Sequence, residues 1–138
     1  MTNEQEVQKR LVLLEYYKEQ LNTIDMQTQY QQAALADLHK AKMTLENLDS
    51  VDTKTDMLIP IGGGAFIATN PSDTTNVLID IGAGYVVEKK GTDAIKQIEK
   101  QIKQVEENQE KLLALSQQLQ NEAAEVSRQA EELTSQQK

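Results

Sequence analysis

The residues that could do chemistry are few in this sequence, and they do not gather into a site. His39 is the only histidine, and the chain has no cysteine. An imidazole beside Lys40 with no ligand-spaced partner can form neither a metal site nor an acid–base pair. Without a thiol, neither a disulfide nor a cysteine nucleophile is possible. We therefore expect no metal site.

Carboxylates are plentiful, but their pattern is that of a solvated helix. Glu106, Glu107 and Glu110 share one helical stretch, and nothing in the sequence implies a concave pocket around them. Acid–base catalysis has no support beyond residue type. We predict that the protein has no catalytic residue, is not an enzyme and binds no cofactor.

Two glycine groups could in principle cradle a phosphate: Gly62-Gly63-Gly64 and Gly82-Ala83-Gly84. Phosphate-binding glycine loops join a strand to a helix N-terminus, where backbone N–H groups meet the ligand. Here each group joins one β-type run to another, and no Gly-Lys-Ser or Gly-Lys-Thr follows. The groups predict tight hairpin turns that need positive φ, not a nucleotide site.

Composition narrows the class of protein further. The formal charge is -8 without a compensating basic stripe, so binding to nucleic acid is not expected. The longest apolar stretch, from Met57 to Ala68, is interrupted by Pro60 and three glycines, and the N-terminus lacks a basic and an apolar region. We expect no membrane span and no signal peptide. The lack of cysteine fits a cytoplasmic location.

The elements that must carry any function follow from three changes in composition. Both ends are rich in Gln, Glu and Leu, and the centre is rich in Gly and β-branched residues. We predict a mainly α fold with a small β region, in which a long antiparallel two-helix coiled coil is joined by two β-hairpins. The predicted domains are 1–50, a coiled-coil helix; 51–91, two hairpins for oligomerisation; and 92–138, a second coiled-coil helix.

The first arm carries a heptad repeat. Arg10 and Lys42 interrupt the seam, and Thr2 and Gln5 have the spacing of a capping box. The a row is Val7, Leu14, Leu21, Thr28 and Leu35, and the d row is Tyr17, Ile24, Gln31, Leu38 and Leu45.

The second arm has an unbroken aliphatic d row. We expect Gly91 to break the chain before this helix and Thr92 or Asp93 to cap it. The d row is Ile98, Val105, Leu112, Leu119, Val126 and Leu133, and the a row is Ile95, Ile102, Gln109, Ser116, Ala123 and Ala130.

Two such seams in one chain satisfy each other by antiparallel packing, with both termini at the free tip. Each arm would reach roughly 70 Å at 1.5 Å per residue, far beyond a small domain. The polar layers Thr28, Gln31, Gln109 and Ser116 then fall near mid-coil. They either fix the register or are tolerated solvated defects.

The centre contains four β-type runs, at 57–61, 65–69, 76–81 and 85–88. Apolar residues occupy consecutive positions, so both strand faces require burial, and we expect nothing else in the chain to cover them. Association with other subunits into a closed barrel or a continued sheet is the favoured outcome, and an internal sheet core is the alternative. The residues assigned to assembly are Ile59, Ile61, Phe66, Ile67, Val77, Ile79, Ile81, Tyr85 and Val87.

The two Gly-turn hairpins, Ile59–Ile67 and Ile79–Lys89, set between two heptad arms, closely resemble the alpha-class prefoldin subunits. Beta-class prefoldins carry one hairpin, so the second hairpin assigns the alpha class. The resemblance implies a hexamer of two alpha-class and four beta-class subunits joined into a β-barrel platform. It also implies an ATP-independent chaperone that holds non-native client proteins between the coil tips and delivers them to a group II chaperonin.

The run from Leu11 to Leu14 brings apolar positions to the outside of the coil near the free tip. Leu11, Val12 and Leu13 fall at heptad positions e, f and g, although single exposed apolar residues are also common on ordinary surfaces. The seam residues beside them can equally be ordinary coiled-coil knobs. The residues assigned to client binding are Val7, Leu11, Val12, Leu13, Val126 and Leu133.

One other function and one other assembly remain open at this point. In one, the protein is a structural scaffold or adaptor whose coil tips bind one defined partner while the β region multimerises. In the other, the family is the same but the chain stacks on itself into larger homo-oligomers. The apolar run near the tip favours a surface for many clients, because a single partner would predict a more distinctive charge pattern.

Overall fold

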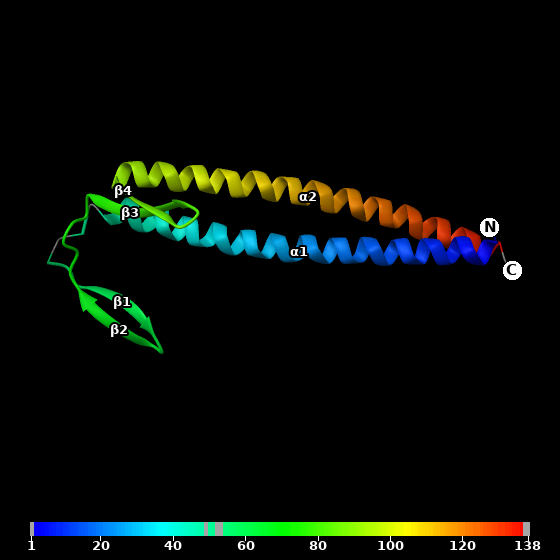
Figure 1. Cartoon of the computed structure of the whole chain (residues 1–138), viewed down its shortest axis with the longest axis horizontal. Coiled ribbons are helices and arrows are strands. Elements are labelled where there is room, and N and C mark those ends of the chain that lie inside the picture. The colour runs from blue at the N-terminus through cyan, green and yellow to red at the C-terminus, as the bar shows by residue number, and fades with distance from the viewer. Residues whose placement is uncertain (1, 49, 52–53, 137–138) are drawn as a thin grey trace. The chain divides into compact units, whose positions relative to one another are not determined.

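The computed structural model describes residues 2–48, 50–51 and 54–136, in the order helix, two β-hairpins, helix (Figure 1). This order confirms the predicted fold class. The domain division stays a prediction, and its outer limits at residues 1 and 138 lie outside the described residues. The elements are α1 (Asn3–Leu48), β1 (Met57–Gly62), β2 (Ala65–Thr69), β3 (Asn76–Gly82), β4 (Tyr85–Lys90) and α2 (Gly91–Ser135).

Contacts divide the chain into two units, which we describe separately. The first combines Met1–Ala34 with Val105–Lys138, and the second is Leu35–Gln104. In the first unit the start of α1 lies beside the end of α2, because the Arg10 guanidinium Nε donates to Gln129 Oε1 at 3.2 Å. The two helices are therefore antiparallel there, as predicted (Figure 1).

The heptad seam is where the helices bury their apolar side chains. In each unit, every a and d position assigned from the sequence is buried or half-buried. Most other positions on both helices are exposed. The seam is thus one narrow stripe per helix, as expected when two amphipathic helices have only each other to pack against. The residues buried most deeply are Ile24, Ala94, Ile98, Ile102 and Ala130.

The charged residues that interrupt the first seam are bridged. In the first unit, Arg10 also donates to the carbonyl of Glu6 at 3.3 Å. In the second unit, the Lys42 ammonium lies 3.4 Å from a Glu99 carboxylate oxygen on the other helix. Partly exposed pairs of this kind stabilise a fold by about 0–1 kcal/mol. These positions are therefore polar contacts between helices and not gaps in the coil.

The sequence predicted the start of α1 correctly but not the start of α2. Gln5 N–H donates to Thr2 Oγ1 at 3.2 Å, and Thr2 N–H donates to Gln5 Oε1 at 3.1 Å, which confirms the capping box. The predicted break at Gly91 is wrong, because α2 begins at that residue directly after β4. The Gly91 N–H donates to the carbonyl of Thr75 at 2.8 Å, so a neighbouring chain segment satisfies this free helix donor.

The hairpins form two separate two-stranded antiparallel sheets with the same local design. The register shifts at Ile61 in the first and at Ile81 in the second, which places a bulge before each turn. The predicted positive φ values are confirmed at all five glycines of the turns. Ala83 also has a positive φ, of +54°. Residues with a side chain rarely adopt this conformation, but two-residue hairpin turns require it.

A hydrogen-bond network organises the segment before β3. The Asp73 carboxylate accepts from the N–H of Thr75 at 2.8 Å, from its hydroxyl at 2.7 Å and from the Asn76 amide at 2.9 Å. These bonds, the Thr75 hydroxyl first, lower the pKa of Asp73 to about 2. Because Thr75 also accepts from Gly91, the network links the start of the second hairpin to the start of α2.

The hairpins differ in how much of their surface is covered. In the first hairpin every residue except Met57 is exposed. In the second, Val77, Ile79 and Val87 are half-buried, and the first two line a hollow with Leu45 of α1 and Ile98 of α2. The expectation that the chain covers none of its strands is therefore wrong for one face of the second hairpin.

The stability of the coil should depend on the side chains in its seam and not on those of its outer surface. Ile102 is 7% exposed and Leu113 is 61% exposed, both on α2. We expect Ile102→Ala to lower the free energy of unfolding by about 2–4 kcal/mol, because a large buried side chain is lost, and Leu113→Ala to change it by less than about 0.5 kcal/mol. Denaturant unfolding followed by helical circular dichroism measures both. Equal losses would contradict the assigned seam.

Candidate interaction surfaces

The residues considered for chemistry remain dispersed in the structure. His39 is exposed on α1, and the carboxylates Glu106, Glu107 and Glu110 are exposed on α2. Within residues 2–48, 50–51 and 54–136, no cluster of three or more His, Asp or Glu residues is arranged to hold a metal ion. None of the helices in this described part is long and apolar enough to cross a membrane.

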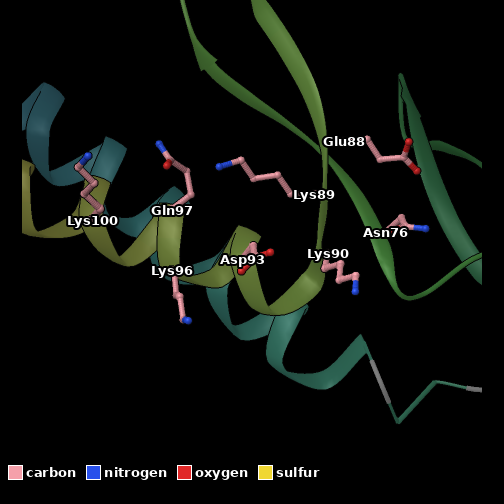
Figure 2. Close-up of a pocket in the computed structure, with 8 residues that line it drawn as sticks. All are labelled: Asn76, Glu88, Lys89, Lys90, Asp93, Lys96, Gln97 and Lys100. Atoms are coloured by element: carbon pink, nitrogen blue, oxygen red, sulfur yellow. The ribbon is translucent and has the colours of Figure 1, made fainter.

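Four lysines surround a hollow at the start of α2: Lys89, Lys90, Lys96 and Lys100 (Figure 2). Asn76, Glu88, Asp93 and Gln97 line it as well. In Figure 2, Lys89 points toward Gln97, whereas Lys90 and Lys96 point to the other side of the helix. The ammonium groups do not converge on one point, so the hollow is not built to hold a single anion.

The first hairpin presents apolar side chains to solvent on both faces. Ile59 and Phe66 are 48% and 58% exposed, and Ile61 and Ile67 are also exposed, so these four predicted assembly residues lie on the surface. Leu58, at 66% exposed, belongs to the same surface but was not assigned from the sequence. Contiguous apolar surface of this kind marks an interaction site in a native protein.

The second hairpin presents one apolar face, and the sequence assignment missed part of it. Leu78 and Val86 are exposed, whereas Val77, Ile79 and Val87 are half-buried, and Val77 and Ile79 line the hollow beside the helices. A signal was available in the sequence. Leu78 pairs with Glu88 across the hairpin, and a face that carries carboxylates points to solvent. Ile81 and Tyr85, at the turn, are exposed as well.

The predicted client residues divide into two groups. Leu11, Val12 and Leu13 are exposed, at 49%, 62% and 38%. Val7, Val126 and Leu133 are half-buried in the seam. A hollow on the coil surface brings two of the six together, because Leu13 and Val126 line it with Glu6, Lys9, Arg10 and Gln129.

A tyrosine and a carboxylate from opposite helices meet near this hollow. Tyr17 of α1 and Glu122 of α2 are close enough for the carboxylate to act on the pKa of the phenol. Desolvation raises the pKa of Tyr17, and the negative charge of Glu122 raises it further. The ring of Tyr16 packs at a tilt against that of Tyr17, with the ring centroids 6.0 Å apart. Tyr16 itself is exposed on the surface.

A second hollow lies farther along the first unit, around the polar seam residue Gln31. Its Oε1 is buried and accepts no hydrogen bond from any described residue. Such an acceptor costs about 1–3 kcal/mol. Tyr30 and Leu115, at 73% and 43% exposed, flank it, and sequence reasoning did not single them out. The only sign of them in the sequence is that each is an apolar residue at an outer heptad position, c for Tyr30 and g for Leu115.

Two helices paired along one seam, with hairpins whose apolar faces lie bare, define a coiled-coil subunit that is built to assemble with others. The family model described as "Prefoldin subunit" matches residues 17–136. The chain therefore belongs to the prefoldin family.

Several relatives of this chain are named as alpha subunits of prefoldin. The chain is 33% identical to prefoldin subunit alpha of Archaeoglobus fulgidus over 126 residues, which covers 91% of this chain and 92% of that one. It is 31% identical to the alpha subunit of Methanobrevibacter smithii, with 96% and 90% covered. It is 29% identical to that of Pyrococcus horikoshii, with 95% and 89% covered.

Solved structures share the fold. One is a filamentous prefoldin from Methanocaldococcus jannaschii, determined by cryo-EM, with a TM-score of 0.59 at 24% identity and 88% and 95% of the two chains covered. Another is the prefoldin beta subunit from Thermococcus strain KS-1, with a TM-score of 0.55 at 20% identity and 91% and 90% covered.

These findings confirm the resemblance drawn from the two hairpins. The chain is an alpha-type prefoldin subunit and has the role of a chaperone subunit. The family is one of chaperones and not of enzymes. No comparison tests which residues contact clients or sister subunits, so those assignments remain predictions.

The Tyr17–Glu122 contact predicts a titration. We expect Glu122→Gln to lower the pKa of Tyr17 while leaving it above the ordinary value of about 10, because desolvation remains after the charge is gone. Since the folded pKa is the higher one, the stability from this contact is complete below about pH 10 and is lost as the pH rises through the folded pKa. Ring-carbon NMR shifts of Tyr17 measure it. An unchanged pKa would contradict the contact.

Proposed function

We propose that this subunit holds non-native proteins at the exposed apolar residues near the coil tip, within a complex assembled through its hairpins. Holding without ATP requires only apolar contacts that adapt to many sequences on an otherwise charged scaffold. The observation that carries the proposal is the exposure of Leu11, Val12 and Leu13 on a helix whose seam is already filled. Val7, Val126 and Leu133 would join them where the helix ends fray.

Assembly would use both faces of the first hairpin and the outer face of the second. Sister beta-class subunits are the natural partners, and the expected arrangement is two alpha-class with four beta-class subunits around a shared β-barrel. The named alpha-subunit relatives and the fold shared with a beta subunit support the pairing with beta-class subunits. Ile59, Ile61, Phe66, Ile67, Ile81 and Tyr85 would pack at the interfaces, with Leu58, Leu78 and Val86 added from their exposure.

Three further properties belong to this proposal. The complex passes its clients to a group II chaperonin, acts in the cytoplasm and catalyses no reaction. The last point is supported by the exposure of His39, Glu106, Glu107 and Glu110 on open helix surface. A scaffold role would instead require one defined partner at the tip.

The assembly proposal predicts the effect of charge on the first hairpin. We expect Phe66→Asp combined with Ile67→Asp to weaken binding to a beta-class partner about tenfold or more, because a carboxylate cannot replace an apolar side chain in a dry interface. The helical content of the isolated chain should not change, because both side chains are more than half exposed. Native mass spectrometry of mixed subunits measures the complex.

The matched control for this variant is Thr69→Asp, at an exposed polar position in the same hairpin. It should assemble like the unmodified chain. If the double variant assembles normally as well, the hairpin does not form the interface.

The holding proposal predicts the effect of removing apolar surface at the tip. We expect Leu11→Ser combined with Val12→Ser, in the assembled complex, to raise the concentration that half-suppresses client aggregation by about threefold or more. Light scattering from a denaturant-unfolded client diluted without ATP measures this. Met26→Ser is the matched control, because Met26 is 59% exposed and occupies the same outward f position as Val12.

Equal effects of the tip and control variants would show that any exposed apolar residue suffices, against a tip site. If even the unmodified complex leaves aggregation unchanged, the holding proposal fails and the scaffold function takes its place. Native mass must remain that of the full complex in each case.

A further inference from the structure

Half of the large apolar residues that are exposed in the described part of the first unit lie on one side of the coil. The others lie at e positions (Leu11, Leu113) and f positions (Val12, Met26). Leu13 and Leu115 occupy heptad g positions, and Tyr16 and Tyr30 occupy c positions. Positions c and g lie on the same side of the seam, and in an antiparallel pair the g positions of the two helices face each other. These four side chains therefore share one side of the coil, which we call the g/c side.

Both hollows of the first unit open on this same side. The tip hollow is lined by Glu6, Lys9, Arg10, Leu13, Val126 and Gln129, and the mid-coil hollow is lined by Gln27, Tyr30, Gln31, Asn108, Lys111, Leu112 and Leu115. Every one of these residues occupies a c, d or g position. The hollows are thus two depressions along one strip and not unrelated surface features.

On α1 the opposite side of the coil is more charged over the same span. The e and b positions of α1 carry Glu15, Lys18 and Asp25 there. Between the tyrosines of the g/c side, α1 carries the uncharged Gln20, Thr23 and Gln27. An apolar chain that lies against α1 would therefore desolvate fewer charged groups on the g/c side. Over this span the charges on this side belong to α2, at Lys111, Glu122 and Glu125.

We propose that an extended segment of a non-native client lies along the g/c side, from the tip hollow at Leu13 to the mid-coil hollow at Tyr30 and Leu115. This inference rests on the proposed holding function and assigns it a path. The distance from Leu13 to Tyr30 is 17 residues of helix, roughly 26 Å at 1.5 Å per residue. About eight residues of extended chain span that length.

The buried Oε1 of Gln31 indicates why an extended chain suits the mid-coil hollow. This acceptor lacks a donor among the described residues, and it belongs to a residue that lines the hollow. An unpaired client chain has free backbone N–H groups, and one of them could reach Gln31 after rotation of its amide. Apolar client side chains would then lie against Tyr30 and Leu115.

The coil of a neighbouring subunit is a poorer occupant of the same strip. Coiled-coil packing needs apolar residues every three to four positions along the contacting face. From Tyr16 to Tyr30 this side of α1 offers only polar residues, with Leu115 contributed by the other helix. Isolated apolar contacts separated by uncharged polar side chains fit a chain of variable sequence better than a second regular helix.

Site-specific photocrosslinking in the assembled complex tests the path without altering the apolar residues. A photoreactive side chain replaces Gln27, which lies on the g/c side, and in a matched variant it replaces Gln29, which lies at a b position on the opposite side; both are exposed. A third variant carries the probe at Lys9, beside the tip hollow. The client is a carboxymethylated, permanently unfolded polypeptide.

We expect client crosslinks from positions 27 and 9 to exceed those from position 29 by about fivefold. Equal crosslinking at 27 and 29 overturns the path. Crosslinks at 9 without crosslinks at 27 overturn it and leave tip holding intact. Crosslinks from 27 to a sister subunit in place of the client overturn it in favour of a coil–coil contact. No client crosslinks anywhere, with no suppression of aggregation, means that the holding function itself has failed.

A second comparison keeps the test independent of probe chemistry. Tyr30→Ser combined with Leu115→Ser should reduce crosslinking from position 27 and leave crosslinking from position 9 within about twofold of the unmodified complex. Leu113→Ser, an exposed leucine at an e position of the same helix, should change neither. If Leu113→Ser reduces crosslinking from 27 as much as the double variant does, the g/c side is not the path.

Discussion

A two-helix seam buries only one stripe of each helix, and the rest of the structure depends on this constraint. The side chains of Ile24, Ile98 and Ile102 are buried because α1 and α2 meet at their a and d positions. No third element covers the outer faces of the described helices in the first unit. The helices therefore satisfy each other along one line and leave a long surface free for other contacts.

The hairpins cannot stabilise themselves in the same way. A two-stranded sheet is marginal in water without a packed face, and the first hairpin leaves both faces bare. The second hairpin is anchored better. Its half-buried face meets residues of α1 and α2, and the Thr75 carbonyl accepts from Gly91 at the first residue of α2. One chain thus carries a self-sufficient coil and an incomplete β region, which is the arrangement expected of an assembling subunit.

Sequence periodicity predicted the elements well, because two-residue turns and heptad seams each leave a strict local pattern. Both glycine turns and all four strands are within two residues of where the pattern placed them. β1 and β3 each end one residue later than predicted, and β4 ends at Lys90 instead of Glu88. The start of α2 could not be predicted, since Gly91 is held by a bond to the distant Thr75. The sequence also did not show that Val77 and Ile79 face the helices. All three residues of Val77-Leu78-Ile79 are apolar, so their pattern does not distinguish the two faces, and the choice depends on where the helices lie.

Hydrogen exchange of backbone amides, compared between the isolated subunit and the assembled complex, tests the central claim most directly. If the coil is complete and the β region is not, amides of the seam around Ile24 and Ile102 should be protected in both states. Amides of the first hairpin, around Ile59 and Phe66, should exchange rapidly in the isolated subunit and become protected on assembly. Slow exchange of this hairpin in the isolated subunit, or no gain on assembly, would contradict the claim.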